Sequence, residues 1–230
     1  PLPPVSEGAK LTTITHGGVS RSWYTYVPAS VAAAPQTVVP LVVDLHGVYS
    51  CVAAGYYQNY TGWIQKAEES GFILVWPQAA DEPIGANGAT GGPRWNAGMC
   101  DECVCENCVY HGQGNNCCRV DANATDVPSN DVDDVGFLRE VVAQVAAAHG
   151  SHPFVDATRV YITGHSYGCV MAQRVLAEAS DLFAAGACFS GALNLADDLG
   201  VYPLTMLSSE YTPRPLMDIY GNADTTIPYA

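Results

Sequence analysis

The chain has few positive charges and no long apolar run. Of its 230 residues, 9 are Lys or Arg and 23 are Asp or Glu, which leaves a formal net charge of -14. This charge repels phosphate backbones and anionic lipids, so we expect neither nucleic acid nor a membrane as a partner. No apolar segment approaches the roughly 20 residues that cross a bilayer. The sequence opens at Pro1 without a signal-peptide pattern, so we expect a mature or trimmed form.

The order of apolar patterns predicts an α/β fold in one domain over residues 1–230. With 48% hydrophobic residues, the chain is long enough to bury one sizeable core. Runs rich in β-branched and aromatic residues alternate with segments of helical spacing. This alternation predicts a mostly parallel central sheet flanked by helices. The expected strands are 20–27, 37–45, 72–76, 160–163, 184–189 and 214–220, and the expected helices are 61–70, 131–148 and 170–179.

Cysteine is abundant and unevenly placed. The chain has 9 cysteines, and six of them lie between Cys100 and Cys118, within a Cys-rich insertion at about 97–120. Such a number is typical of an oxidising compartment, so we predict a secreted, extracellular protein. The sequons at Asn59 and Asn123 agree with this prediction.

Disulfides within the insertion are the preferred interpretation of its cysteines. Their C-x-x-C spacing also suits a zinc site, which is the alternative, but an oxidised chain favours disulfides and we expect no metal. We expect Cys169 and Cys188 to be buried thiols, and no partner for Cys51 can be deduced. Because nine is odd, at least one cysteine is free, or pairs with a further segment or another chain.

One short motif indicates the chemistry. Gly164-His165-Ser166-Tyr167-Gly168 spells G-x-S-x-G between the strand expected at 160–163 and the helix expected at 170–179. In α/β-hydrolases the serine of this motif lies on a sharp strand-to-helix turn and attacks the substrate. We therefore predict Ser166 as a nucleophile.

The oxyanion hole of that fold uses two backbone N–H groups. One belongs to the residue after the nucleophile, here Tyr167, and the other to a loop after an early strand. We predict Val48 as the second donor, from the run His46-Gly47-Val48. His46 and His165 flank these motifs, and we expect them to orient or pack rather than to act as bases.

The acid and the base complete the expected triad. Asp224 follows the last expected strand and is our candidate acid, whereas Asp218 lies inside that strand and is the weaker one. Chain order in this fold is serine, acid, histidine, yet no histidine follows Asp224. The upstream candidates are His16, His111, His149 and His152, of which His111 lies on the segment freest to reach the site. The simpler explanation, which we prefer, is truncation, with the C-terminal strand and helix of the fold lacking.

Together the motifs resemble the secreted polyhydroxybutyrate depolymerase-like esterases, which include feruloyl and acetylxylan esterases. The resemblance runs from about His16 to Tyr229. It implies a serine hydrolase that forms an acyl-enzyme on esters without a cofactor, with Ser166 and Asp224 at the nucleophile and acid positions. It also implies that Trp95 and Asn96 line or support the substrate cleft. We group His46 with these substrate-binding residues because it lies beside the site, next to Gly47. The motifs are residues 45–47, 76–77, 94–98, 117–118, 131–137, 159–166 and 220–224.

The resulting hypothesis is a secreted serine carboxylesterase acting on feruloyl, acetylxylan or polyhydroxyalkanoate esters. Its partner would be a small-molecule or polymer-linked ester. A peptidase or lipase on the same fold is one alternative. A non-catalytic binding protein that lacks the base histidine is another, and a metal-binding cysteine module is a third. In the Asp133-Asp134 pair, acids in a first helical turn favour a structural role over acid/base chemistry. The sequence does not fix the oligomeric state.

Overall fold

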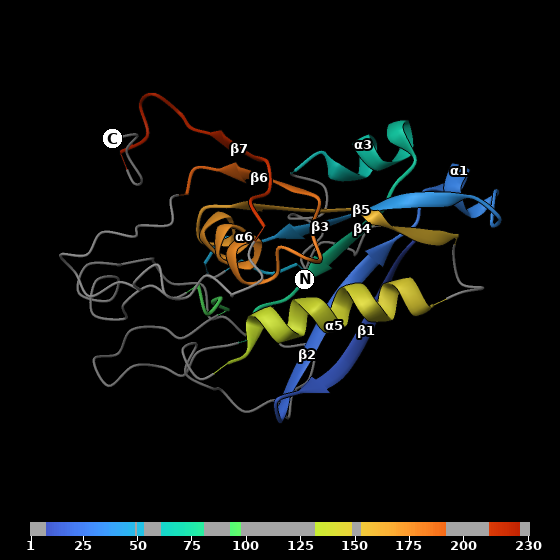
Figure 1. Ribbon diagram of the computed structural model, residues 1–230, viewed down its shortest axis with the longest axis horizontal. Coiled ribbons are helices and arrows are strands. Elements are labelled where there is room, and N and C mark those ends of the chain that lie inside the picture. The colour runs from blue at the N-terminus through green and yellow to red at the C-terminus, as the bar shows by residue number, and fades with distance from the viewer. Residues whose placement is uncertain are drawn as a thin grey trace, which may run out of the picture.

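A computed structural model describes residues 8–48, 50–52, 61–80, 93–97, 132–148, 153–191 and 212–225 of the chain. Within them, seven strands form one sheet in the order β1-β2-β4-β3-β5-β6-β7 (Figure 1). The strands are β1 Ala9–His16, β2 Val19–Tyr26, β3 Val38–Leu45, β4 Ile73–Pro77, β5 Phe154–His165, β6 Ala185–Phe189 and β7 Leu216–Ile219. The helices are α1 Ala29–Ala32, α3 Trp63–Ser70, α5 Asp134–Ala147 and α6 Tyr167–Glu178.

The sheet is parallel except at one side. β1 and β2 are antiparallel, as are β2 and β4, whereas β4, β3, β5, β6 and β7 run parallel to their neighbours. The expected α/β fold with a mostly parallel sheet is therefore confirmed. β1 was not expected, because its sequence AKLTTITH has no apolar run and its residues are exposed or half-buried. In a parallel sheet the carboxyl ends of the strands meet at one edge, where ligands bind in such folds.

Helices cover both faces of the sheet (Figure 1). On one face, α5 and α6 pack against β3 and β5 in a large apolar cluster that includes Val43, Ile162 and Phe137. On the other face, Ala67 of α3 packs with Val42 and Trp76. Because β3 is buried on both faces, its near-continuous apolar sequence is physically required.

Asp133 and Asp134 begin α5 in structural roles, as expected. The Asp133 carboxylate is the N-cap and accepts a hydrogen bond from the Gly136 N–H at 2.8 Å. Asp134 is buried, and its carboxylate accepts a hydrogen bond from Arg21 at 2.5 Å and another from the Asn96 N–H at 2.5 Å. The Arg21 guanidinium also lies 3.9 Å over the Phe137 ring. The Arg21–Asp134 ion pair therefore joins β2 to α5.

We expect Asp134→Ala to lower the free energy of unfolding by about 4 kcal/mol, because it leaves the buried Arg21 cation without its counter-ion. Denaturant titration of both proteins checks this. Asp181→Ala is the matched control, since Arg139 and Asp181 form an exposed pair at 2.5 Å and such pairs contribute less than about 1 kcal/mol. Equal losses in the two variants would contradict the assignment of Asp134 as a structural anchor.

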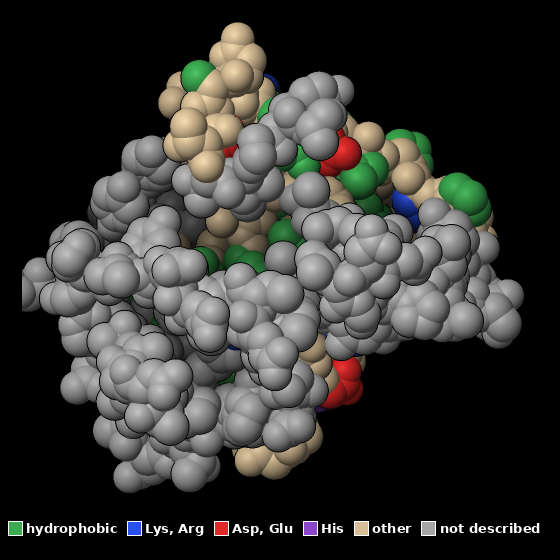
Figure 2. Space-filling model, turned by 90° about the vertical axis from the view of Figure 1, so that its left-hand side faces the viewer, with side chains coloured by type: hydrophobic (Ala, Val, Ile, Leu, Met, Phe, Trp, Pro, Cys, Tyr) green, Lys and Arg blue, Asp and Glu red, His purple; other side chains and the backbone are tan. Residues whose placement is uncertain are grey.

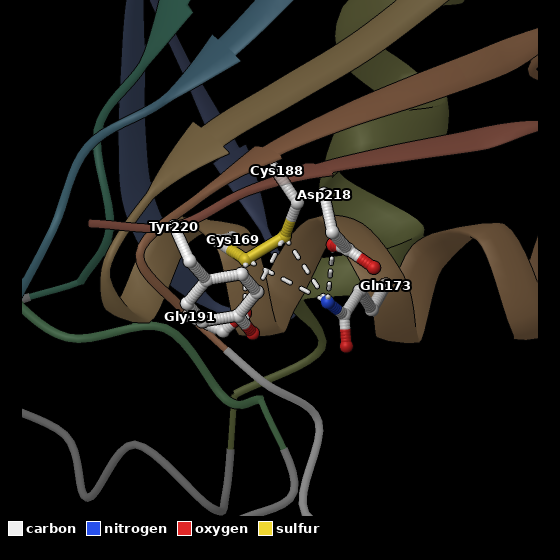
Figure 3. Close-up of a disulfide and its surroundings, with 6 residues drawn as sticks. All are labelled: Cys169, Gln173, Cys188, Gly191, Asp218 and Tyr220. Carbon is white, nitrogen blue, oxygen red and sulfur yellow. Dashed lines mark hydrogen bonds between the residues drawn. A yellow bond between two sulfur atoms is a disulfide. The ribbon is translucent and has the colours of Figure 1, made fainter. Parts of the chain in front are cut away.

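The structure corrects the expectation for Cys169 and Cys188. They are buried, but they form a disulfide with a Cα–Cα distance of 4.8 Å rather than two thiols (Figure 3). The bond joins the first turn of α6 to the end of β6. The sequence could not reveal this pairing, because it depends on where α6 lies against β6. Cys51 is buried, and the six cysteines of the insertion lie outside the described residues.

We expect the double variant Cys169→Ala/Cys188→Ala to lose about 3 kcal/mol of unfolding free energy, the loop-closure value for a separation of 19 residues. Denaturant titration measures the loss, and mass spectrometry of an unreduced digest identifies the linked peptides. Alkylation of both sulfurs in the unfolded, unreduced protein would show that the bond does not form.

Candidate active site

Ser166 occupies the sharp turn that the motif predicts. It lies between β5 and α6 with φ 54° and ψ -121°, a backbone conformation that is strained for a residue with a side chain. A Cβ atom on Gly164 would lie 2.2 Å from the Gly168 carbonyl oxygen, and one on Gly168 would lie 2.2 Å from the Leu45 carbonyl oxygen. Both motif positions therefore require glycine, and their close contacts hold α6 against β3 and β5.

The predicted oxyanion donors lie on either side of this turn. Tyr167 is the first residue of α6, where a helix leaves N–H groups without intrahelical partners and favours negative charge. Its hydroxyl accepts a hydrogen bond from the buried Arg94 at 3.1 Å. In the facing loop, a Cβ atom on Gly47 would lie 3.4 Å from the Ser166 Cβ. Val48 follows directly and is half-buried. The two predicted segments are thus brought together.

The segment after β7 carries the predicted acid to the same edge. The Tyr220 hydroxyl donates a hydrogen bond to the Gly191 carbonyl, which joins this segment to the end of β6 (Figure 3). Burial lowers the pKa of His165, and the charge of Asp224 opposes that shift. Asp224 therefore interacts electrostatically with the residue beside Ser166. Asp218 instead is exposed and accepts a hydrogen bond from Gln173 at 3.3 Å.

None of the described histidines fills the place of a base. His16 pairs with Asp133 at 3.2 Å. His46 is fully buried, with contacts at both ring nitrogens, and burial lowers its pKa to about 4. His165 precedes Ser166 at the end of β5 and lines a neighbouring cavity. His111, His149 and His152 lie outside the described residues.

Hydrogen bonds to neighbouring segments hold the predicted cleft residues in place. Trp95 and His46 are both 0% exposed, and the Trp95 indole N–H donates to the His46 carbonyl at 2.9 Å. Asn96 donates to the Val132 carbonyl at 2.9 Å, and its own carbonyl accepts from Arg174 at 2.5 Å. The burial of Trp95 and His46 and the hydrogen bonds of Asn96 favour the supporting role over direct contact with substrate.

A cavity of about 400 Å³ lies beside the turn, between α3 and the ends of three strands. It is lined by Asp44, Thr61, Gly62, Trp63, Lys66, Gly164, His165 and Phe189. Burial raises the pKa of Asp44 to about 8, and the nearby Trp76 and Trp63 lower it only in part. On the face shown in Figure 2, hydrophobic side chains lie at the bottom of a hollow.

One group of sulfur and carboxylate atoms has the close spacing of metal ligands. Among the described residues, the sulfurs of Cys169 and Cys188 and the Asp218 carboxylate lie within 4.8 Å of one another. The sulfurs are bonded to each other, so they do not offer thiolate ligands. None of the described helices is both long and apolar enough to cross a bilayer.

Sequence reasoning missed three residues of this region. Asp44, Gln78 and Arg94 are all buried next to the turn. Asp44 and Gln78 lie at the carboxyl ends of β3 and β4, so the edge rule for parallel sheets provides a signal for them. Nothing in the local sequence around Arg94 indicates its contact with Tyr167, because the two residues are 73 positions apart.

Known proteins share the fold of this chain. The Prolyl oligopeptidase family pattern matches residues 129–213, which include the serine turn. A solved acetyl xylan esterase from Aspergillus awamori superposes with a TM-score of 0.57 and 19% identity, over 95% of this chain and 74% of that one. A thermostable esterase superposes with a TM-score of 0.56 and 17% identity, over 97% of this chain and 49% of that one. The chain has the α/β-hydrolase fold.

The curated relatives of this chain are esterases by name. Acetylxylan esterase A of Emericella nidulans is 25% identical over 183 residues, which are 80% of this chain and 46% of that protein. Feruloyl esterase B of Talaromyces funiculosus is 26% identical over 193 residues, 83% of this chain and 42% of that protein. The expected resemblance to these esterases is confirmed. The chain spans about half the length of such relatives.

Proposed function

We propose that the native protein is a serine carboxylesterase. The observation that carries this proposal is the strained turn at Ser166, which faces the Gly47–Val48 loop while Tyr167 begins α6. A serine held in this way presents its hydroxyl at the edge of the sheet, with backbone donors on both sides. Stabilising the charge that develops on a carbonyl oxygen is commonly the largest single contribution to acyl transfer.

The proposed reaction has two halves. Ser166 Oγ forms a bond to the ester carbonyl carbon while a base takes its proton, and the Tyr167 and Val48 N–H groups hold the oxyanion. The bond to the alcohol then breaks, the base returns the proton to the alcohol, and an acyl-enzyme remains. Water enters through the same steps in reverse and releases the acid. Asp224 orients the base, a histidine that we place outside the described residues. No cofactor takes part.

The proposed substrates are acetyl or feruloyl esters on polysaccharides, or polyhydroxyalkanoate esters. The names of the curated relatives support the first two classes. Extracellular location is part of the proposal. It is supported by the 9 cysteines of the chain and by the Cys169–Cys188 bond, since disulfides persist in oxidising compartments.

A peptidase is the second candidate, because the matching family pattern is named for an oligopeptidase. The test is a rate comparison on the native protein, using p-nitrophenyl acetate, methyl ferulate, acetylated xylan, a polyhydroxybutyrate film and a proline-containing peptide amide. We expect kcat/KM for one of the ester classes to exceed that for the amide by at least about 100-fold. Faster cleavage of the amide would favour the peptidase. No turnover of any substrate by the folded protein would favour a binding protein.

A further inference from the structure

The loop that carries the proposed Val48 donor is held by a buried network around His46. The His46 side chain is 0% exposed and lies at the end of β3, directly before Gly47. Because the side chain is buried, it does not contact a substrate, although it lies close to the proposed oxyanion donor.

The first contact concerns the Gly47 carbonyl. His46 Nδ1 lies 2.6 Å from the Gly47 oxygen, and the Ser50 N–H donates to the same oxygen at 3.2 Å. A carbonyl oxygen can only accept, so His46 Nδ1 carries the proton and donates it. The Gly47 carbonyl therefore has two donors that fix its direction.

The direction of the Gly47 carbonyl also fixes the direction of the Val48 N–H. The described chain has no cis peptide bond, and in a planar trans peptide the C=O and the following N–H point in opposite directions. The donors on the Gly47 oxygen therefore also set the direction of the Val48 N–H, on the far side of the peptide from the His46 ring. Gly47 itself approaches Ser166, since a Cβ atom there would lie 3.4 Å from the Ser166 Cβ.

The other ring nitrogen fixes the tautomer. The Ala79 N–H donates to His46 Nε2 at 3.0 Å, and the Gln78 side-chain amide lies 3.1 Å from the same atom. Both are donors, so Nε2 must remain without a proton. Burial and the charge of Arg21 both lower the pKa of His46, to about 4, which agrees with a neutral ring.

Gln78 also joins the ring to the rest of the loop. Its Oε1 accepts from the Val52 N–H at 2.9 Å, and its Nε2 approaches the Ser50 carbonyl at 3.3 Å. The Trp95 indole holds the preceding carbonyl, that of His46, at 2.9 Å. The Gln78 side chain, directly after β4, thus connects His46 to Ser50 and Val52.

We propose that His46, with its tautomer fixed by Gln78 and the Ala79 N–H, is a positioning residue that aims the Val48 N–H at the oxyanion. This inference rests on the proposed esterase function and adds to it. A donor whose hydrogen bond to the oxyanion forms only in the transition state affects kcat rather than KM. A residue with a merely structural role would lower stability and leave the kinetics of the folded fraction unchanged.

The kinetic test compares two substitutions at one position in the native protein. His46→Leu removes both ring nitrogens, and we expect kcat to fall roughly 100-fold with little change in KM, the effect of losing one oxyanion donor. His46→Asn retains an N–H near the position of Nδ1 and should recover kcat to within about tenfold of the wild type. A boronic acid that forms a tetrahedral serine adduct should lose affinity in parallel with kcat.

Val145→Ala is the control for stability, because Val145 is buried in α5 and takes no part in the loop. It should retain the wild-type kcat despite a loss of unfolding free energy. A His46→Leu protein with wild-type kcat would overturn the inference. Failure of the proposed function looks different, because the wild type itself would then not turn over esters.

A second measurement does not depend on activity. NMR of the histidine ring nitrogens near neutral pH should show His46 protonated at Nδ1 and unprotonated at Nε2. In Gln78→Met, loss of one Nε2 donor should shift the Nε2 resonance while Nδ1 stays protonated. A proton on Nε2 in the wild type would overturn the proposed orientation of the Gly47–Val48 peptide.

Discussion

Ser166→Ala should lower the kcat of the native protein for its preferred ester by roughly 10⁴-fold or more, with the fold intact. The reason is that the hydroxyl forms the covalent bond to the acyl group, and no neighbouring side chain replaces it. Alanine removes one oxygen atom from a half-buried position, so the unfolding transition should change little. Initial rates with p-nitrophenyl acetate and a thermal melt check both parts.

Ser70→Ala is the matched control, because Ser70 is an exposed serine at the end of α3. It should retain full activity. A Ser166→Ala protein that hydrolyses the ester at the wild-type rate would place the nucleophile elsewhere. A variant that has lost its fold would be recognised in the melt, and Ser166→Gly then provides a second removal of the hydroxyl, at a position whose φ of 54° suits glycine.

Asp44→Asn should make the protein more stable than the wild type at pH 8 and leave stability almost unchanged near pH 4. Asp44 is 3% exposed, and burial raises its pKa from 3.8 to about 8. Between these values the folded state keeps the proton and the unfolded state releases it. Stability of the wild type therefore falls as pH rises through this window, by a total on the order of 5 kcal/mol, and asparagine removes this contribution.

Urea titrations of both proteins at several pH values between about 4 and 8 measure the effect. Other groups titrate in the same range, including His46 with its pKa of about 4, but they contribute equally to both proteins. The difference between the two curves therefore isolates Asp44. Parallel curves would mean that Asp44 is ionised in the folded protein, and they would contradict the raised pKa.

Local patterns allowed much of the fold to be predicted. β3 and β4 are buried on both faces, so their sequences are continuous apolar runs that can be recognised without a structure. The turn at Ser166 was predictable because its two glycines and its serine are adjacent in sequence. β1 was missed because its leucine and isoleucine are separated by threonines, so no apolar run marks this strand.

Contacts between distant segments could not be predicted. Arg21 and Asp134 are 113 residues apart, and His46 and Ala79 are 33 apart, so neither pair follows from any spacing. The Cys169–Cys188 bond depends on the position of α6 against β6, which composition does not reveal. The substrate assignment for His46 rested on its place next to Gly47, and only the burial of its ring indicates a supporting role.

Covalent labelling shows whether Ser166 is an activated nucleophile. The native protein would be treated with a fluorophosphonate probe, digested, and analysed by mass spectrometry, with Ser166→Ala and Ser70→Ala in parallel. We expect one labelled peptide that contains Ser166, present in Ser70→Ala and absent in Ser166→Ala. A folded native protein without label at Ser166 would contradict it and would favour a binding protein with this fold.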